Sequence, residues 1–171
     1  MTLTRDEPMR DRLDRDRLDR DGLARLIPHA GAMRLLDGVL SWDRSRIRCT
    51  ASSHRDPGNP LRHAGRLAAL CGVEYAAQAM AAHGGLTGAA EGRPPAAGYL
   101  ASLRDLACHV GRLDDIAGDL VVEAENLTGE GNRVIYAFTI HADGAELLSG
   151  RAAVVIDAAP GGAPANGMGP P

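Results

Sequence analysis

The sequence predicts an α+β fold in which one curled antiparallel sheet wraps around a single long helix. The segment from Leu67 to His83 consists almost entirely of Ala, Leu, Val and Met, and a helix that is apolar on all sides is buried on most of them. Two strand-like segments precede it and four follow it. This order differs from the strand–helix alternation of nucleotide-binding folds and favours one sheet packed on one helix.

The first elements lead into a polar loop. Gly22 to Ile27 has the pattern of a short helix that Pro28 closes. Met33 to Trp42 and Arg44 to Ser52 follow as strands, and in the second of them apolar residues alternate with Arg and Thr, as in a half-buried strand. The turn-rich stretch from Ser53 to Gly65 then predicts a loop before the central helix.

The later elements are separated by glycine signals. Gly84-Gly85 predicts the end of the central helix, and a Gly- and Pro-rich connection runs from Thr87 to Ala97. Asp143-Gly144 is a strong signal for a tight hairpin turn. The remaining strands are expected at Gly98–Leu106, Leu120–Leu127, Arg133–Ala142 and Ala145–Ile156.

The two ends of the chain differ from the middle in composition. Residues 1–21 are dominated by alternating Arg and Asp and offer little apolar surface to bury, so we expect a charged tail. Residues 158–171 are mostly Ala, Gly and Pro, which predicts a disordered C-terminal tail. The folded domain is therefore expected over residues 22–157, a length that suits one compact domain.

Composition argues against several classes of function. The net charge is −3 and no concentrated basic face is evident, so nucleic-acid binding is not expected. The 19 basic residues are all Arg, which excludes a lysine nucleophile or Schiff base. No run of about 18 apolar residues marks a membrane span, and the N-terminus lacks an apolar signal region.

The cysteines suggest neither a metal site nor a disulfide framework. Cys49, Cys71 and Cys108 are widely spaced and odd in number, and no C-x-x-C motif occurs. We therefore expect no bound metal and a reducing, cytoplasmic location.

Glu74 is the most conspicuous candidate for chemistry. It is the one acid in the apolar central segment. Burial among apolar groups disfavours the charged carboxylate and raises its pKa, which suits a general acid. Gln78 lies one turn later on the same face and is expected to orient it. The alternative is a glutamate at an exposed helix edge, or one with a structural hydrogen-bonding role.

Residues near the start of this helix are candidates for substrate binding. Free backbone N–H groups at a helix start can stabilise a developing oxyanion, such as the oxygen of a polarised thioester. Gly72 and Cys71 occupy that region, and together with Gln78 they form the predicted substrate-binding set. If the helix already begins at Leu67, Gly72 is only a packing glycine.

Of the six histidines, His54 is the favoured catalytic base. It lies where the second strand becomes the loop, and such junctions place side chains at the rim of a sheet. His63, in the same loop, is the second candidate. His29 follows a turn and His83 ends the central helix, and neither is assigned a role in catalysis.

Several motifs, taken in chain order, resemble the bacterial β-hydroxyacyl-acyl-carrier-protein dehydratases over roughly residues 23–157. They are Leu26-Ile27-Pro28-His29, Leu35-Leu36-Asp37-Gly38-Val39, Glu74-Tyr75-Ala76-Ala77-Gln78, Gly98-Tyr99-Leu100-Ala101-Ser102-Leu103, Ile116-Ala117-Gly118-Asp119-Leu120, and the closing hairpin from Asn132 to Ile156. The fuller wording of three segments is similar to the branch associated with aryl-polyene pigment clusters: Ile27 to Met33, Asn59 to Arg62 and Glu74 to Met80.

The resemblance implies a hot-dog fold and an acid–base pair. In the family a Gly-His-Phe-Pro motif supplies the histidine and the central helix supplies the acid, which implies the pair His54 and Glu74. Ser53 and Arg55 depart from that motif, and the loop after His54 is longer than in the family. These departures raise the alternative of a degenerate subunit in a heterodimer.

The implied reaction removes water from a 3-hydroxyacyl thioester on acyl carrier protein in fatty-acid or polyene synthesis. His54 would remove the α-hydrogen, N–H groups near Gly72 would stabilise the enolate-like oxygen, and Glu74 would protonate the leaving hydroxyl. No metal or nicotinamide is needed because the thioester acidifies its own α-carbon, and the substrate brings the phosphopantetheine arm. Arginines suited to an acidic carrier protein are Arg62, Arg66 and Arg104.

Two further expectations concern assembly and rival activities. A sheet wrapped on one helix leaves a sheet edge and a helix flank open, so a homodimer or a heterodimer with a second hot-dog subunit is expected. A hot-dog acyl-thioesterase is the rival enzyme, because Glu74 could equally activate water. A non-catalytic subunit of a heteromeric dehydratase is the rival without activity.

Overall fold

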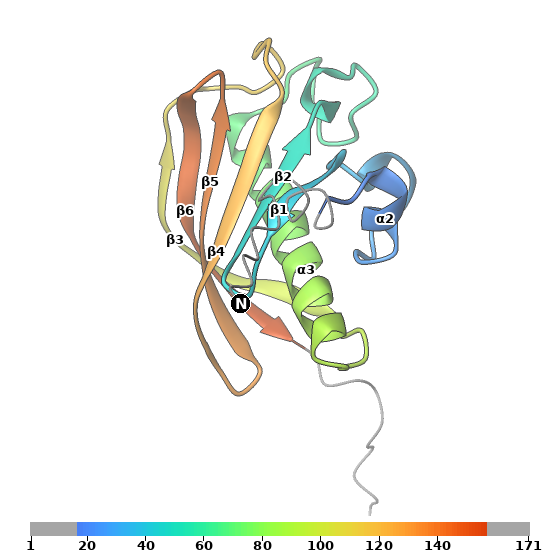
Figure 1. Cartoon of the computed structure of the whole chain (residues 1–171). Coiled ribbons are helices and arrows are strands. Elements are labelled where there is room, and N and C mark those ends of the chain that lie inside the picture. The colour runs from blue at the N-terminus through green and yellow to red at the C-terminus, as the bar shows by residue number, and fades with distance from the viewer. Residues whose placement is uncertain (1–16, 157–171) are drawn as a thin grey trace, which may run out of the picture.

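The computed structural model describes residues 17–156 and shows a curled sheet around one long helix, which confirms the predicted fold class (Figure 1). Its six strands lie in the order β1-β2-β4-β5-β6-β3, and each neighbouring pair is antiparallel. The predictions for residues 1–16 and 157–171 lie outside the described residues. The strands are β1 (Gly38–Trp42), β2 (Arg46–Ala51), β3 (Gly98–Cys108), β4 (Leu120–Glu130), β5 (Arg133–Ala142) and β6 (Ala145–Ile156).

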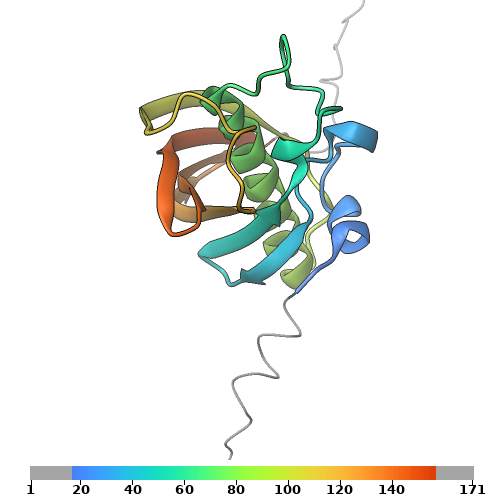
Figure 2. The same cartoon turned by 90° about the horizontal axis from the view of Figure 1, so that it is seen from above.

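The central helix α3 (Gly72–Ala90) lies in the hollow of the sheet, as the view from above shows (Figure 2). It packs against β2, β4 and β5. The core between them is mainly aliphatic, with Tyr75, Tyr136 and Phe138 as its buried aromatic residues among those described. None of the described helices has the length and hydropathy of a membrane span.

α3 begins and ends later than predicted. The helix does not begin at Leu67 because the backbone of that residue is bonded elsewhere: its N–H donates to Asp114 Oδ1 at 2.8 Å, and its carbonyl accepts from the Leu113 N–H at 2.8 Å. A 3-10 turn at Ala69–Cys71 then precedes α3. The prediction that Gly84-Gly85 ends the helix is wrong. Both glycines are helical, and the left-handed residue just past the end is Gly92, with φ 69°.

The N-terminal helix α2 (Arg20–Ala24) begins two residues before the predicted start and ends three residues before the predicted end. Asp19 caps it, since its Oδ1 accepts the Gly22 N–H at 2.8 Å. Leu18 exchanges two backbone hydrogen bonds with Val39, at 3.1 and 2.8 Å. Residues 18–21, predicted to belong to the charged tail, are thus part of the fold.

The first strand begins at Gly38 instead of Met33. Residues 29–35, which we call the strap, cross over α3 and contain a 3-10 turn at Gly31–Met33. The backbone of the strap bonds to the Gln78 side chain at Met33 and Leu35 rather than to a neighbouring strand. A side chain of α3 therefore takes the place of a strand partner here.

The C-terminal half follows the prediction closely. β5 and β6 have the predicted bounds, and the turn between them has positive φ at Asp143 and Gly144 (51° and 78°), which confirms the expected tight hairpin. β3 and β4 run two and three residues further than predicted.

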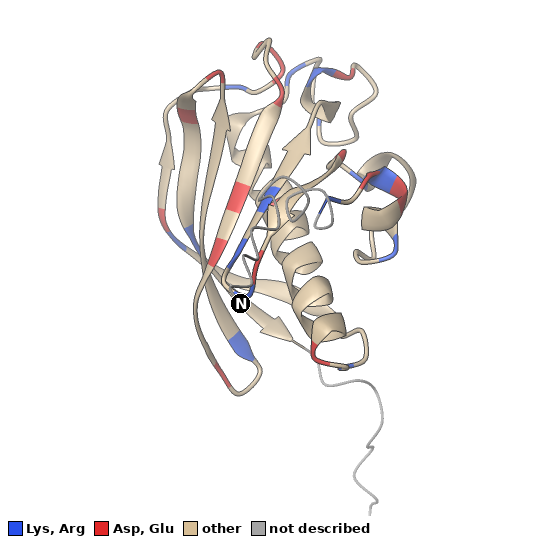
Figure 3. Ribbon diagram, in the orientation of Figure 1, with Lys and Arg blue, Asp and Glu red and all other residues tan. Residues whose placement is uncertain are grey.

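Charged residues are spread over the strands and the loops, while the visible turns of α3 carry almost none (Figure 3). Arg46 pairs with Glu125 at 3.2 Å, and Arg48 pairs with Glu123 at 2.6 Å, each across β2 and β4. The outer face is thus solvated, and the inner face holds the core and the helix.

Candidate active site

Glu74 lies in the first turn of α3, and its side chain is 33% exposed in the single chain. The sequence-based expectation of an acid enclosed by apolar groups is therefore not met within one subunit. The reason is helical geometry: one stripe of α3 faces away from the sheet. The partly exposed positions of that stripe are Val73, Glu74, Ala77 and Ala81, preceded by the exposed Leu70.

The two oxygens of the Glu74 carboxyl have different surroundings. Oε1 lies 3.0 Å from His29 Nε2 and accepts the Gln78 Nε2–H at 3.2 Å. Oε2 has no hydrogen bond to any residue from 17 to 156. One oxygen is thus held by the protein and the other is open, which suits a carboxyl that exchanges a proton with a ligand.

Gln78 does more than contact Glu74. Its fully buried amide accepts the Leu35 N–H at 3.0 Å and donates to the Met33 carbonyl at 2.7 Å. Ser53 Oγ also donates to the Leu35 carbonyl, at 2.6 Å. These bonds fix the strap over α3 and place His29 beside Glu74.

His29 has no predicted role in catalysis, although it lies within one of the family-like motifs. Its ring contacts an acid in a different element, and only the course of the strap brings the two together. The side chain is 26% exposed, yet its Nδ1 is buried and has no partner among the described residues. This arrangement was not visible from the periodicity of the sequence.

His54, the predicted base, is fully buried and has no contact with Glu74 of its own chain. Its Nε2 lies 3.1 Å from the Ile116 carbonyl, while Nδ1 has no partner within the described chain. Burial lowers the pKa of this imidazole, so it is neutral near pH 7. Its predicted role as the base thus stays a prediction.

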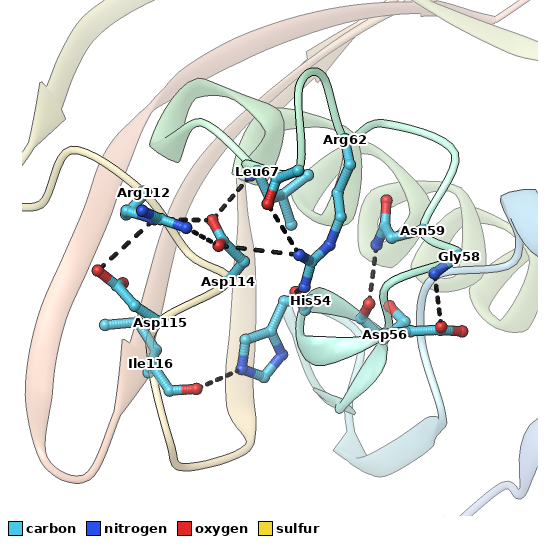
Figure 4. A network of polar contacts seen from close by, with 12 residues as sticks. His54, Asp56, Gly58, Asn59, Arg62, Leu67, Arg112, Asp114, Asp115 and Ile116 are labelled. Atoms are coloured by element: carbon cyan, nitrogen blue, oxygen red, sulfur yellow. Dashed lines mark hydrogen bonds and ion pairs between the residues drawn. The ribbon is translucent and has the colours of Figure 1, made fainter.

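The loop after β2 and the loop between β3 and β4 are joined around His54 (Figure 4). Arg62 donates to the His54 carbonyl at 3.0 Å and lies 3.8 Å from Asp114, whose carboxylate also binds Arg112. The hydrogen bond from Arg112, with a second from the Leu67 N–H, holds the pKa of Asp114 well below its usual range. Since Ile116 follows two residues later, this network fixes the carbonyl that orients the His54 ring.

A second buried cluster ties the same loop to α3. The Tyr75 hydroxyl lies 3.0 Å from Ser53 Oγ and accepts from Asn59 Nδ2 at 2.9 Å. Asn59 also donates to the Ser53 carbonyl at 2.9 Å. Burial raises the pKa of Tyr75, so the hydroxyl stays protonated and available for these bonds. The loop after β2 is thereby anchored next to Glu74.

Gly72 and Cys71 have packing contacts rather than open polar groups in the single chain. The Gly72 N–H donates to the carbonyls of Ala69 and Leu70, so it is not free for an oxyanion. A Cβ on Gly72 would lie 2.7 Å from Leu148 Cδ2, which makes the glycine a close-approach position. Cys71 Sγ lies 3.8 Å from the Leu61 carbonyl. A substrate-binding role for Cys71 stays a prediction.

The arginines expected to meet a carrier protein differ in availability. Arg62 is committed to Asp114 and to backbone carbonyls, and its side chain is 14% exposed. It therefore belongs to the internal network. Arg66 and Arg104 are exposed. The second histidine candidate, His63, is exposed as well, and no contact joins it to Glu74 among the described residues.

Comparison with known proteins places the chain in a family. The model of the ApeP-like family, described as ApeP dehydratase, matches residues 22–160. No curated protein matches the chain. Among solved structures, the dehydratase heterocomplex ApeI:P from Xenorhabdus doucetiae aligns with a TM-score of 0.72 at 21% identity, covering 80% of this chain and 91% of that one.

Two thioesterases share the fold at lower similarity. The putative thioesterase from Shewanella oneidensis gives a TM-score of 0.56 at 13% identity, over 86% of this chain and 98% of that one. A thioesterase from Haemophilus influenzae gives 0.57 at 13% identity, over 82% and 91%. These likenesses concern the fold alone, whereas the family match confirms the dehydratase branch that the motifs had indicated. The chain belongs to the ApeP dehydratase family.

Proposed function

We propose that this chain dehydrates a 3-hydroxyacyl thioester carried on acyl carrier protein, in the synthesis of a polyene. The observation that carries the proposal is Glu74: a carboxyl with one held and one open oxygen, at the partly exposed start of the central helix of a dehydratase-family chain. A carboxylic acid with an open oxygen is suited to protonate a leaving hydroxyl.

The proposed reaction is an elimination of water from the 3-hydroxyacyl thioester. A base takes the proton from the α-carbon, and that electron pair forms the double bond to the β-carbon as the C–O bond breaks. Glu74 gives its proton to the leaving hydroxyl, so the products are an enoyl thioester and water. The base is then protonated and Glu74 ionised, and a proton passing from one to the other through solvent restores the starting state.

A second hot-dog subunit supplies the imidazole opposite Glu74 in this proposal. Within one chain His54 is turned to Ile116 and His29 binds the acid directly, so neither lies across a substrate from it. The described structure leaves the outer edge of β3 unpaired, with Tyr99, Leu100, Leu103 and Leu106 exposed. Exposed apolar groups on a free strand edge favour pairing with another subunit.

The carrier protein and the location follow from the substrate. Acyl carrier proteins are acidic, and exposed Arg66 and Arg104 offer complementary charge. The arm of the substrate brings its own thioester, so the reaction as proposed uses no cofactor. We place this chemistry in the cytoplasm.

The test separates dehydration from hydrolysis. The full chain, purified with any subunit that accompanies it from its native host, is mixed with a 3-hydroxyacyl thioester on acyl carrier protein. We expect ultraviolet absorbance from an enoyl thioester and no free thiol. The variant Glu74→Gln should lower kcat by about 10²- to 10⁴-fold, because it removes the proton donor.

The matched control lies at the other end of the same helix. Glu91 is paired with the exposed Arg93 at 2.7 Å, and Glu91→Gln should leave the rate unchanged. Release of free thiol would instead identify a thioesterase. An unchanged rate with Glu74→Gln in the assembled complex would make this chain a non-catalytic subunit.

A further inference from the structure

We propose that His29 is a positioning residue which, together with Gln78, determines which oxygen of Glu74 carries the transferable proton. The inference rests on the proposed function and goes beyond it, because it assigns a task to a residue outside the expected acid–base pair. It starts from the asymmetry of the carboxyl: Oε1 faces two nitrogen atoms, at 3.0 and 3.2 Å, and Oε2 faces none among residues 17–156.

The orientation of the Gln78 amide is fixed by its backbone partners. A backbone N–H can only donate, so the amide atom 3.0 Å from the Leu35 nitrogen is the oxygen. The other amide atom is therefore the nitrogen, with two hydrogens. One points to the Met33 carbonyl at 2.7 Å and the second to Glu74 Oε1 at 3.2 Å. Gln78 is thus a donor to Oε1 whatever the charge of Glu74.

The tautomer of His29 follows from its second nitrogen. Nδ1 is buried without a partner among the described residues, and a buried unpaired N–H is rarer and costlier than a buried unpaired lone pair. The hydrogen of a neutral His29 is therefore on Nε2, where it points at Glu74 Oε1. Oε1 then accepts from two donors.

Two donors on one oxygen decide where an acidic hydrogen resides. A protonated carboxyl has one accepting oxygen and one O–H, and a hydrogen on Oε1 would face the N–H groups of His29 and Gln78. The hydrogen therefore resides on Oε2, the open oxygen. The strap and Gln78 also prevent rotation of the carboxyl, so the same oxygen is presented in each catalytic cycle.

The experiment replaces His29 with two residues of similar size. His29→Gln keeps an N–H at the position of Nε2, and His29→Met removes it. We expect His29→Met to lower kcat by about ten- to a hundredfold with KM little changed, because the lost hydrogen bond strengthens only as Glu74 gives up its proton and becomes a carboxylate. His29→Gln should stay within about threefold of the wild type.

A second histidine–glutamate pair supplies the control. His109 lies 3.2 Å from Glu146 on the surface, and His109→Met should leave kcat unchanged. Equal losses for His29→Gln and His29→Met, or no loss for either while Glu74→Gln is inactive, would overturn the role of His29 and leave the dehydratase proposal standing. A fully active Glu74→Gln would instead overturn the proposed function.

Nitrogen NMR tests the tautomer without any substitution. With ¹⁵N-labelled histidine in the full chain, we expect the His29 signal of a protonated Nε2 and an unprotonated Nδ1. A spectrum with the hydrogen on Nδ1 would contradict the proposal even if His29→Met failed to fold.

Discussion

At the scale of single residues, burial sets the charge of two histidines. His83 is fully enclosed, with Nε2 2.8 Å from the Asp43 carbonyl and Nδ1 2.9 Å from the Tyr136 hydroxyl. Burial lowers the pKa of His83 and of His54 below the ordinary 6.5. Both rings are therefore neutral near pH 7, and Nε2 of His83 donates to a backbone carbonyl.

Stability is therefore expected to fall as the solution becomes acidic. Below pH 6.5 the unfolded chain binds protons at these two histidines while the folded chain does not, so unfolding is favoured. For each pH unit below 6.5, each histidine lowers the free energy of unfolding by up to about 1.4 kcal/mol, until the pH reaches the pKa of that histidine in the folded protein. Carboxylates of lowered pKa, such as Asp43, act at more acidic pH.

Urea unfolding between about pH 7.5 and 5 measures this slope. His83→Gln keeps a donor and an acceptor but does not titrate, so its slope should be shallower than that of the wild type. Equal slopes for the two proteins would show that His83 binds its proton equally in the folded and unfolded chains, which contradicts a lowered pKa.

The sequence indicated part of the site at this scale and missed the rest. Glu74 and Gln78 were identified because polar residues stand out in an apolar helix, and their hydrogen bond confirms that Gln78 contacts the acid. His29 was missed because it meets Glu74 only through the course of the strap. His54 was selected by its place at a strand end, and within the chain its ring contacts the Ile116 carbonyl and not an acid.

At the scale of secondary-structure elements, α3 shows why glycine is an ambiguous signal. Gly84 and Gly85 were expected to end the helix but lie inside it, and Gly72 begins it. A Cβ on Gly72 would meet Leu148 and Ile140 at 2.7 and 3.0 Å, whereas one on Gly84 would meet nothing within 4 Å. Packing therefore requires a glycine at position 72, whereas Gly84 has no packing role and only lowers the stability of the helix.

These two glycines make opposite predictions for alanine. Gly84→Ala should raise the free energy of unfolding by about 0.5–1 kcal/mol, because alanine loses less backbone entropy in a helix. Gly72→Ala should lower it, because its methyl group enters an occupied space. Urea unfolding compares the two, and a destabilised Gly84→Ala would show that another surface packs closely against that position.

At the scale of the whole molecule, the fold was predictable because it follows from the order of its elements. One apolar helix between two strands and four strands leaves few arrangements other than a sheet curled around it. The long edge strand β3 was predicted as a strand, but its exposure was not. Exposure at an edge depends on strand order, which places β3 last, beside β6.

Assembly through that edge is a testable consequence. Leu103→Asp places a charge on the exposed apolar edge of β3 and should cause the assembly to dissociate while the chain stays folded. Sedimentation should then give a lower mass than for the wild type. Leu127→Asp, at another exposed leucine on β4, is the matched control and should leave the mass unchanged. A wild-type chain that is fully active as a monomer would contradict the two-subunit site.

Proton donation by Glu74 to the leaving group is tested most directly by changing that group. A 3-chloroacyl thioester eliminates chloride, which needs no proton to depart, while a 3-hydroxyacyl thioester must be protonated. We predict that Glu74→Gln loses about 10²- to 10⁴-fold in rate on the hydroxy substrate but less than about tenfold on the chloro substrate. Equal losses on both substrates, or no loss on either, would contradict a proton-donating role for Glu74.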